Sequence, residues 1–117
     1  MKIIEDLLSA KPELTKWRRD IHAHPEIAFE EHRTASIVAE KLKEFGLEVE
    51  TGIAGTGVVG RLTRGRGNRA IGLRADLDAL PIQEANDFAH KSTNPGKTHA
   101  CGHDGHTTML LGAAQHL

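Results

Sequence analysis

The N-terminal stretch of the chain repeats its apolar residues with the period of an α-helix. Leu14, Trp17 and Ile21 stand at positions i, i+3 and i+7, so their spacing predicts a helix with one buried stripe. Pro12 suits the first turn of such a helix, because its missing N–H would have no partner there. We therefore expect Pro12 to separate or kink off an earlier helical turn, which would hold the apolar pairs Ile3-Ile4 and Leu7-Leu8.

A second helix is predicted over residues 31–45. Apolar residues recur there on one face, and Gly46 follows at the position that favours a C-terminal cap. Between the two helices, residues 22–26 include two histidines and a proline and are expected to turn the chain. The apolar face of the second helix consists of Ala35, Val38, Leu42 and Phe45, with Ala39 beside them.

After the second helix, the pattern changes to the two-residue period of β-strands. Residues 47–50 alternate apolar and polar side chains, and a glycine-containing turn leads to a predicted partner strand over 58–62. The apolar segment 70–75 predicts a central strand. We expect that strand to carry Asp76 and Asp78 at its carboxyl end, where open α/β sheets bind their ligands.

The C-terminal part combines a polar loop with an apolar helix. Residues 83–97 are polar and rich in turn formers, and a third helix is predicted from Gly105 or His106 onward, over residues 107–117. Together the elements predict an α/β fold in which helices flank a mixed sheet. The third helix is so apolar that it must pack into a small three-layer unit or be covered by further residues of a larger enzyme.

Composition and charge exclude several classes of function. The 117 residues are 38% hydrophobic and 26% charged, with a formal net charge of -1, which is ordinary for a soluble globular domain. This charge gives no electrostatic reason to expect nucleic acid or an anionic membrane as a partner. One cysteine permits no internal disulfide, and no apolar run suggests a signal peptide or membrane span, so we expect a cytoplasmic protein. A basic cluster is expected to be a solvated turn; it comprises Arg61, Arg64, Arg66 and Arg69.

The run 99–106 concentrates metal-ligating residue types. It holds the single cysteine of the chain, and histidines recur around it. Residues two apart project from the same face of an extended segment, so Cys101 and His103 can direct sulfur and nitrogen toward one cation. These two ligands make only part of a site, because catalytic zinc usually takes three protein ligands and a water. His106, Asp76 and Asp78 are the nearest candidates for further ligands.

Spacing alone leaves other roles open for these residues. Cys101 can be a small buried side chain beside a hydrogen-bonded imidazole, a ligand of a structural metal-binding module, or the nucleophile of a cysteine hydrolase or redox protein. Asp76 and Asp78 can simply cap a turn, and Asp104 can favour a helix N-terminus. The histidines outside the run are expected at the surface; they are His22, His24, His32, His90 and His116.

Three blocks of sequence carry a family resemblance. Residues 18–26 read Arg-Arg-Asp-Ile-His-Ala-His-Pro-Glu, residues 73–82 read Leu-Arg-Ala-Asp-Leu-Asp-Ala-Leu-Pro-Ile, and residues 99–106 read His-Ala-Cys-Gly-His-Asp-Gly-His. In this order, the blocks resemble the N-terminal portion of the metal-dependent amidohydrolases related to hippurate hydrolase, N-acyl-amino-acid amidohydrolases and auxin-conjugate hydrolases. The resemblance covers nearly the whole chain, and it implies that the block with His22 and His24 is a structural corner and not a source of ligands.

The resemblance implies a zinc-peptidase-like fold and a role for each matching residue. Cys101 and His103 would be metal ligands, and Asp78 would be a catalytic-site carboxylate that orients a ligand or the metal-bound water. Sister branches have His-x-Asp where this chain has Asp76-Leu77-Asp78, which fits a site that uses Cys101 instead. The resemblance implies two divalent metal ions per site, with zinc expected and manganese, cobalt or nickel as alternatives. The implied substrate is a small N-acyl amino acid, whose amide bond is cleaved by metal-activated water.

The resemblance also implies that residues 1–117 are the N-terminal part of the metal-dependent catalytic domain. In the family pattern, the glutamate general base, the later ligands, the rest of that domain and an inserted lid or dimerisation domain follow further along. We therefore expect the 117 residues alone to be inactive. A homo-oligomer is compatible with this pattern, and neither nucleic acid nor a membrane is expected as a partner.

Overall fold

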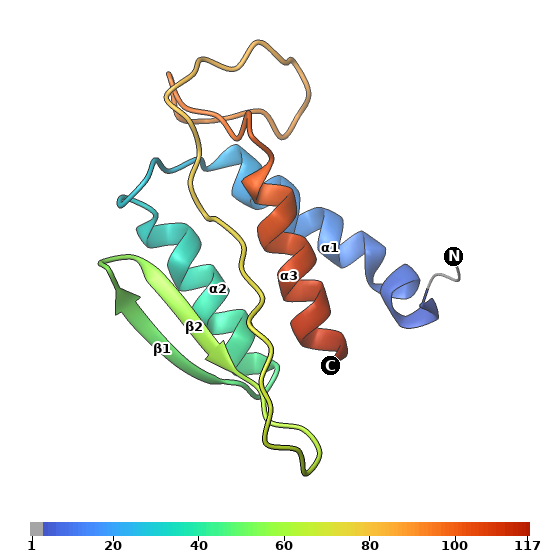
Figure 1. Ribbon diagram of the computed structural model, residues 1–117. Helices are drawn as coiled ribbons and strands as arrows, with labels where there is room; N and C mark the ends of the chain where they lie inside the picture. The colour runs from blue at the N-terminus through green and yellow to red at the C-terminus, as the bar shows by residue number, and fades with distance from the viewer. Residues whose placement is uncertain (1–3) are drawn as a thin grey trace.

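The computed structural model describes residues 4–117, which form three helices and a β-hairpin (Figure 1). Helix α1 packs against helix α3, while helix α2 packs against α3 and against both strands. After the hairpin, the chain runs in an extended form between α2 and α3 to a long loop at the top of the view. The elements are α1 (Glu5–Ala23), α2 (His32–Glu44), β1 (Glu48–Ile53), β2 (Gly57–Arg61) and α3 (His103–His116).

The hydrophobic core lies between the three helices and the hairpin. Trp17 of α1, Val38 and Leu42 of α2, and Leu111 of α3 form one buried cluster. Ile21 of α1 is also completely buried. Burial of each such side chain stabilises the fold by about 1.5–3 kcal/mol. The apolar stripes that the sequence predicts for the first two helices are therefore confirmed as core-facing.

Helix α1 begins at Glu5 and continues through Pro12, so the expectations that Pro12 stands in the first turn of a helix and separates off an earlier turn are wrong. The alternative, a kink at Pro12, stays a prediction. A proline inside a helix leaves the carbonyl four residues earlier without its N–H partner. Here that carbonyl belongs to Leu8, and both residues are exposed, so water can satisfy it. Ile3, which belongs to the same expectation, lies outside the described residues.

Helix α2 begins with help from a side chain that precedes it. Glu26 accepts hydrogen bonds from the backbone N–H groups of Arg33 at 2.8 Å and Thr34 at 2.7 Å. The Thr34 hydroxyl donates to the same carboxylate at 2.6 Å. These N–H groups have no partner inside the helix, so Glu26 caps it from outside. The backbone carbonyl of Glu26 also accepts the N–H of Ala79 at 2.7 Å, which attaches this corner to the segment after Asp78.

The hairpin is antiparallel, with Glu48 opposite Arg61 and a register shift between Thr51 and Ile53. Gly52 lies at this shift with φ 77°, a conformation that suits glycine in a β-bulge. Arg61 forms ion pairs with Glu48 at 3.4 Å and with a second glutamate of β1 at 3.7 Å. All four arginines of the predicted solvated cluster are exposed, which confirms that expectation.

The segment 70–75 is extended but is not a strand, so the expected central strand of a mixed sheet is not formed within residues 4–117. A strand needs a hydrogen-bonded neighbour, and Ile71 and Leu73 are instead 89% and 61% exposed. The chain is paired again just after the aspartates, where Ala79 forms a parallel bridge with Ile27. None of the helices in the described part of the chain is long and apolar enough to cross a membrane.

Candidate functional site

The extended segment 76–78 and the first turn of α3 meet at one place. Nδ1 of His103 lies 3.0 Å from Oδ1 of Asp78 and 2.9 Å from its backbone oxygen. Both partners are acceptors, so Nδ1 carries a hydrogen and Nε2 is the nitrogen left for another ligand. Nε2 lies 3.9 Å from Oδ2 of Asp76, which is too far for a hydrogen bond. The imidazole therefore presents an unbonded nitrogen beside two carboxylates.

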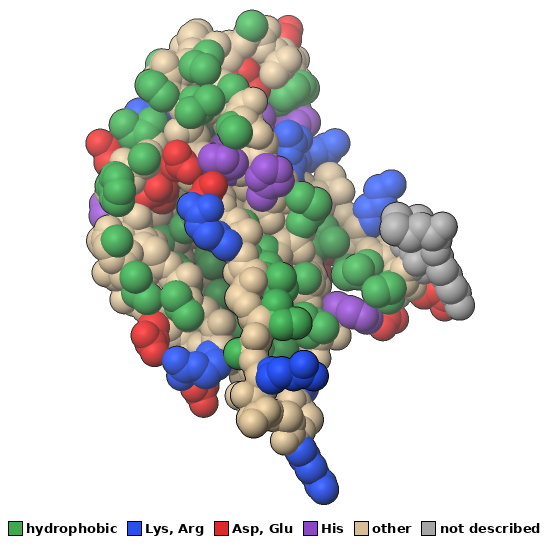
Figure 2. Space-filling view, viewed as in Figure 1, with side chains coloured by type: hydrophobic (Ala, Val, Ile, Leu, Met, Phe, Trp, Pro, Cys, Tyr) green, Lys and Arg blue, Asp and Glu red, His purple; other side chains and the backbone are tan. Residues whose placement is uncertain are grey.

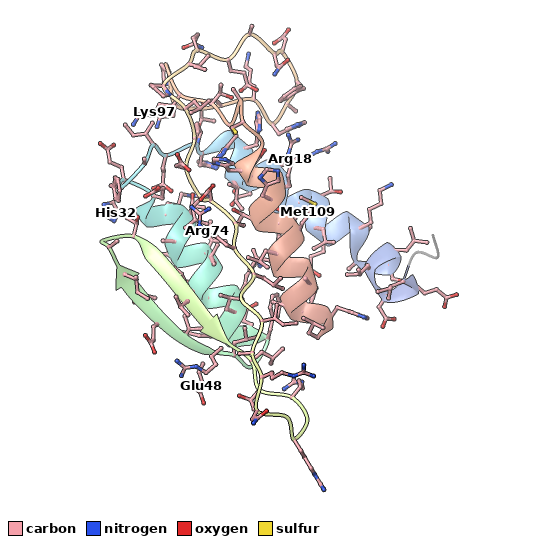
Figure 3. All side chains as sticks on the ribbon, viewed as in Figure 1. Arg18, His32, Glu48, Arg74, Lys97 and Met109 are labelled. Carbon is pink, nitrogen blue, oxygen red and sulfur yellow. The ribbon has the colours of Figure 1, made fainter. Side chains whose placement is uncertain are left out.

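The second carboxylate is held by its own contacts. Arg74 forms an ion pair with Asp76, and the Thr107 hydroxyl of α3 donates to the Asp76 backbone oxygen at 3.0 Å. Arg74 lies on the extended segment, in the middle of the molecule (Figure 3). Histidine, acidic and basic side chains lie close together on this face (Figure 2). The structure thus brings both predicted aspartates to His103.

Cys101 lies just before α3 and is exposed. Gly102 separates it from His103 and adopts φ 93°, ψ 17°, in the left-handed region that favours glycine. Because the chain turns there, α3 begins at His103, two or three residues before the start at Gly105 or His106 that the sequence predicts. Within residues 4–117, no three His, Cys, Asp or Glu side chains are arranged to hold a metal ion.

The donors present fit part of a metal site. A cysteine thiolate and an imidazole nitrogen are ligands that zinc commonly takes. Histidine ligands usually donate their second N–H to a carboxylate or a backbone carbonyl, which fixes the tautomer. His103 has both kinds of partner on Asp78, and its other nitrogen is open. The fit is incomplete, because the described residues supply two such donors near each other in sequence and no third.

Three buried polar side chains lie together beside the site, although the sequence-based prediction does not connect them. They are His22 of α1, Asp104 of α3 and Glu84 of the loop before α3. His22 is 4% exposed, so the surface alternative for it is wrong, and its burial fits the structural corner that the resemblance implies. Its neighbours in sequence offer a clue, because it directly follows the buried Ile21. Glu84 stands in a polar loop without any pattern that could indicate its role.

Burial and hydrogen bonding act in opposite directions on Glu84. Burial favours the neutral acid, but bonds from the Ser92 backbone N–H, from His22 and from Asn86 outweigh it and lower the pKa of Glu84 to about 2. Glu84 is therefore ionised at neutral pH, and it accepts all three hydrogen bonds.

His99 is a further buried imidazole that the sequence-based prediction does not single out. It is 5% exposed, and neither ring nitrogen has a hydrogen-bond partner among residues 4–117. Burial lowers the pKa of His99; the charges of Asp104 and Asp78 oppose this, and those of His22 and His103 add to it. The ring centroids of His99 and His22 are 6.3 Å apart, so His99 neighbours the buried polar cluster.

A known protein family matches the part of the chain that contains the candidate site. Residues 72–117, which include Asp78, Cys101 and His103, match Peptidase family M20/M25/M40. The chain is 52% identical to the hippurate hydrolase of Campylobacter jejuni over 117 residues, which are 100% of this chain and 30% of that protein. It is 50% identical to the N-acyl-L-amino acid amidohydrolase of Geobacillus stearothermophilus over 105 residues, or 90% of this chain and 28% of that protein.

A solved structure shows the same arrangement of elements. The Bacillus subtilis YXEP protein, described as a dinuclear metal binding peptidase from the M20 family, superposes with a TM-score of 0.87 at 37% identity. The match covers 92% of this chain and 30% of that one. The expected α/β peptidase fold is thus confirmed, as a partial copy of it. The chain spans about 30% of the length of the curated relatives it matches, and its residues 72–117 match the model of the M20/M25/M40 peptidase family.

Proposed function

We propose that residues 1–117 are the N-terminal part of the catalytic domain of a metal-dependent amidohydrolase. The observation that carries this proposal is the orientation of His103, whose Nδ1 bonds to Asp78 while its Nε2 stays open, two residues along the chain from the exposed Cys101. This is the orientation of a metal-ligating histidine with a supporting carboxylate. Relatives named hippurate hydrolase and N-acyl-L-amino acid amidohydrolase support an N-acyl amino acid as the substrate.

Each residue has a defined role in this proposal. Cys101 and His103 hold a divalent metal ion through sulfur and Nε2, and Asp78 keeps His103 in the correct tautomer and direction. Zinc is proposed because it suits this donor pair, with manganese, cobalt or nickel as alternatives. When bound, two metal ions would polarise the amide carbonyl and lower the pKa of a water to near neutrality. The YXEP protein, described as dinuclear, supports a pair of ions.

The remaining ligands, the general base and a lid or dimerisation domain are proposed to lie outside residues 1–117. Residues 4–117 contain no group of three or more side chains that could hold a metal ion, so we propose that these residues do not hydrolyse amides alone. The proposed location is the cytoplasm, where an exposed thiol stays reduced.

Protection of Cys101 from alkylation tests this function. In the full-length protein that carries this sequence, zinc should slow iodoacetamide modification of Cys101 by about tenfold or more, because a metal-bound thiolate is a poorer nucleophile. His103→Ala should remove the protection. His116→Ala, at the other end of α3, should retain it. Mass spectrometry of the Cys101 peptide gives the rates.

Equal rates with and without zinc would contradict metal binding by Cys101. If alkylation of metal-free protein also abolished an activity that chelators leave intact, Cys101 would instead be a nucleophile. Hydrolysis of hippurate by the zinc-loaded full-length protein, lost on chelation, is the expected activity.

A further inference from the structure

A chain of short hydrogen bonds lies buried beside the candidate metal ligands. Nδ1 of His22 lies 2.7 Å from Oδ2 of Asp104, and Nε2 lies 2.7 Å from Oε1 of Glu84. The side chains of His22, Asp104 and Glu84 are only 5%, 1% and 4% exposed. Arg18 reaches Asp104 from the rim, with Nε 2.8 Å from Oδ2 and a side chain that is 39% exposed (Figure 3).

The hydrogen-bonding chemistry fixes the charges along this chain. An ionised carboxylate only accepts, so a histidine bonded to two carboxylates donates from both ring nitrogens as an imidazolium. The order is then guanidinium, carboxylate, imidazolium, carboxylate, and the four charges cancel. Buried charges are tolerated when they are paired in this way. Removing His22 would leave two carboxylates facing each other without a donor between them.

The chain ends on the helix turn that carries the proposed ligand. Asp104 directly follows His103, is completely buried, and accepts the Gly105 N–H at 2.9 Å. Asp104 and His103 are successive residues of the same helical turn, about 100° apart around the helix axis. If this turn rotates about the axis, both side chains therefore move together. The first turn is therefore held on one side by His22 and on the other by the bond from His103 to Asp78.

The other end of the chain is anchored just as firmly. Glu84 accepts hydrogen bonds from the backbone N–H of Ser92 and from Asn86 at 3.1 Å. The same loop is tied to the end of α1, because the Thr93 hydroxyl donates to the backbone oxygen of Ala23 at 2.7 Å. The three segments thus form one frame around His22.

We propose that the Glu84–His22–Asp104 chain positions the first turn of α3 and thereby sets the direction in which His103 presents Nε2 to the metal. His22 is a positioning residue in this proposal, since it touches neither metal nor substrate. The proposal rests on the proposed function, because it assigns His103 as a metal ligand.

Cobalt binding to the full-length protein tests the proposal without relying on activity. Co²⁺ bound to a thiolate gives a ligand-to-metal charge-transfer absorption, and competition with a chelator gives the affinity. His22→Leu should weaken Co²⁺ binding by about 10- to 100-fold, the usual effect of losing a residue that orients a metal ligand. His22→Asn keeps a donor near the Nδ1 position and should restore part of the affinity.

His24→Leu is the matched control. His24 stands two residues later on the same helix end, is 41% exposed, and bonds to the Asp20 backbone oxygen at 2.8 Å, outside the chain. It should bind Co²⁺ like the wild type. If His22→Leu does not fold, Arg18→Met removes the rim end of the chain from a part-exposed position and should show a smaller loss of affinity.

The outcomes separate the two proposals. Wild-type affinity and absorption in a folded His22→Leu or Arg18→Met variant, even with a lower melting temperature, would overturn the positioning role and leave the proposed function intact. A wild-type protein that shows no thiolate–cobalt absorption would overturn the proposed function, and the positioning role with it.

Discussion

At the scale of single residues, the position of Cys101 relative to His103, the two proposed ligands, depends on Gly102. Its φ of 93° turns the chain so that Cys101 stays outside α3 while His103 begins it. A side chain at this position would be strained by about 1–2 kcal/mol, because a Cβ crowds the backbone in the left-handed region. The spacing of cysteine and histidine is visible in the sequence, but the sign of this dihedral angle is not.

Replacing two neighbouring glycines should give opposite changes in stability. Gly102→Ala should lower the free energy of unfolding by about 1–2 kcal/mol through this strain. Gly105→Ala should raise it by about 0.5–1 kcal/mol, because Gly105 lies inside α3, has no atom within 4 Å of a built Cβ, and gains helix propensity. Urea unfolding of both variants measures this. A loss of stability in both would show that the dihedral angle of Gly102 is not the cause.

At the scale of elements, local patterns predict most of the helices and the hairpin. The helical period identifies the faces that contain Trp17 and Val38, and these faces are buried. The start of α3 and the polar cluster around His22 are missed, because they depend on a backbone turn and on contacts between distant segments. Glu84 lies 62 positions from His22 in sequence, and only the folded loop brings them together.

The loop that carries Glu84 should make stability depend on acid pH. The folded-state pKa of Glu84, about 2, lies below its ordinary value of 4.5. Its contribution is therefore fully present above pH 4.5 and is lost as the pH falls toward 2. Glu84→Gln should flatten the dependence of the unfolding free energy on pH across this window.

Asp87→Asn controls for the change in net charge, since Asp87 lies in the same loop and its side chain is 97% exposed. Denaturant unfolding between pH 2 and pH 6 measures all three proteins. An undiminished slope in Glu84→Gln would show that the bonds of Glu84 do not stabilise the folded state.

At the scale of the whole molecule, the extended segment 70–75 lacks a partner strand among the described residues, and its large apolar side chains are exposed. A pattern of apolar residues predicts that a segment is buried, but the neighbour that buries it can come from anywhere in a protein. Ile71 and Leu73 are exposed here, and the backbone beside them lacks a partner strand within residues 4–117. Such an edge favours pairing with another chain.

The 117-residue chain alone should therefore self-associate as its concentration rises. Ile71→Ser combined with Leu73→Ser should reduce this association with little loss of stability, because both side chains are exposed. Met109→Ser, which removes a 64% exposed side chain from α3, should not reduce it. Sedimentation velocity over a concentration series gives the masses. A concentration-independent monomer of the unsubstituted chain would contradict the expectation.

The bridge between Leu80 and Thr98 closes the intervening loop at its base, with backbone bonds of 3.0 Å in both directions. Asp78 and Cys101 stand just outside this junction. The bridge, and not the length of the loop, therefore fixes the distance between these two residues. The tip around Asp87 could then accept a grafted peptide or epitope while the metal ligands keep their spacing. Such a graft would have to leave Glu84 and its bonds to Asn86 and Ser92 in place, because the same loop carries that carboxylate.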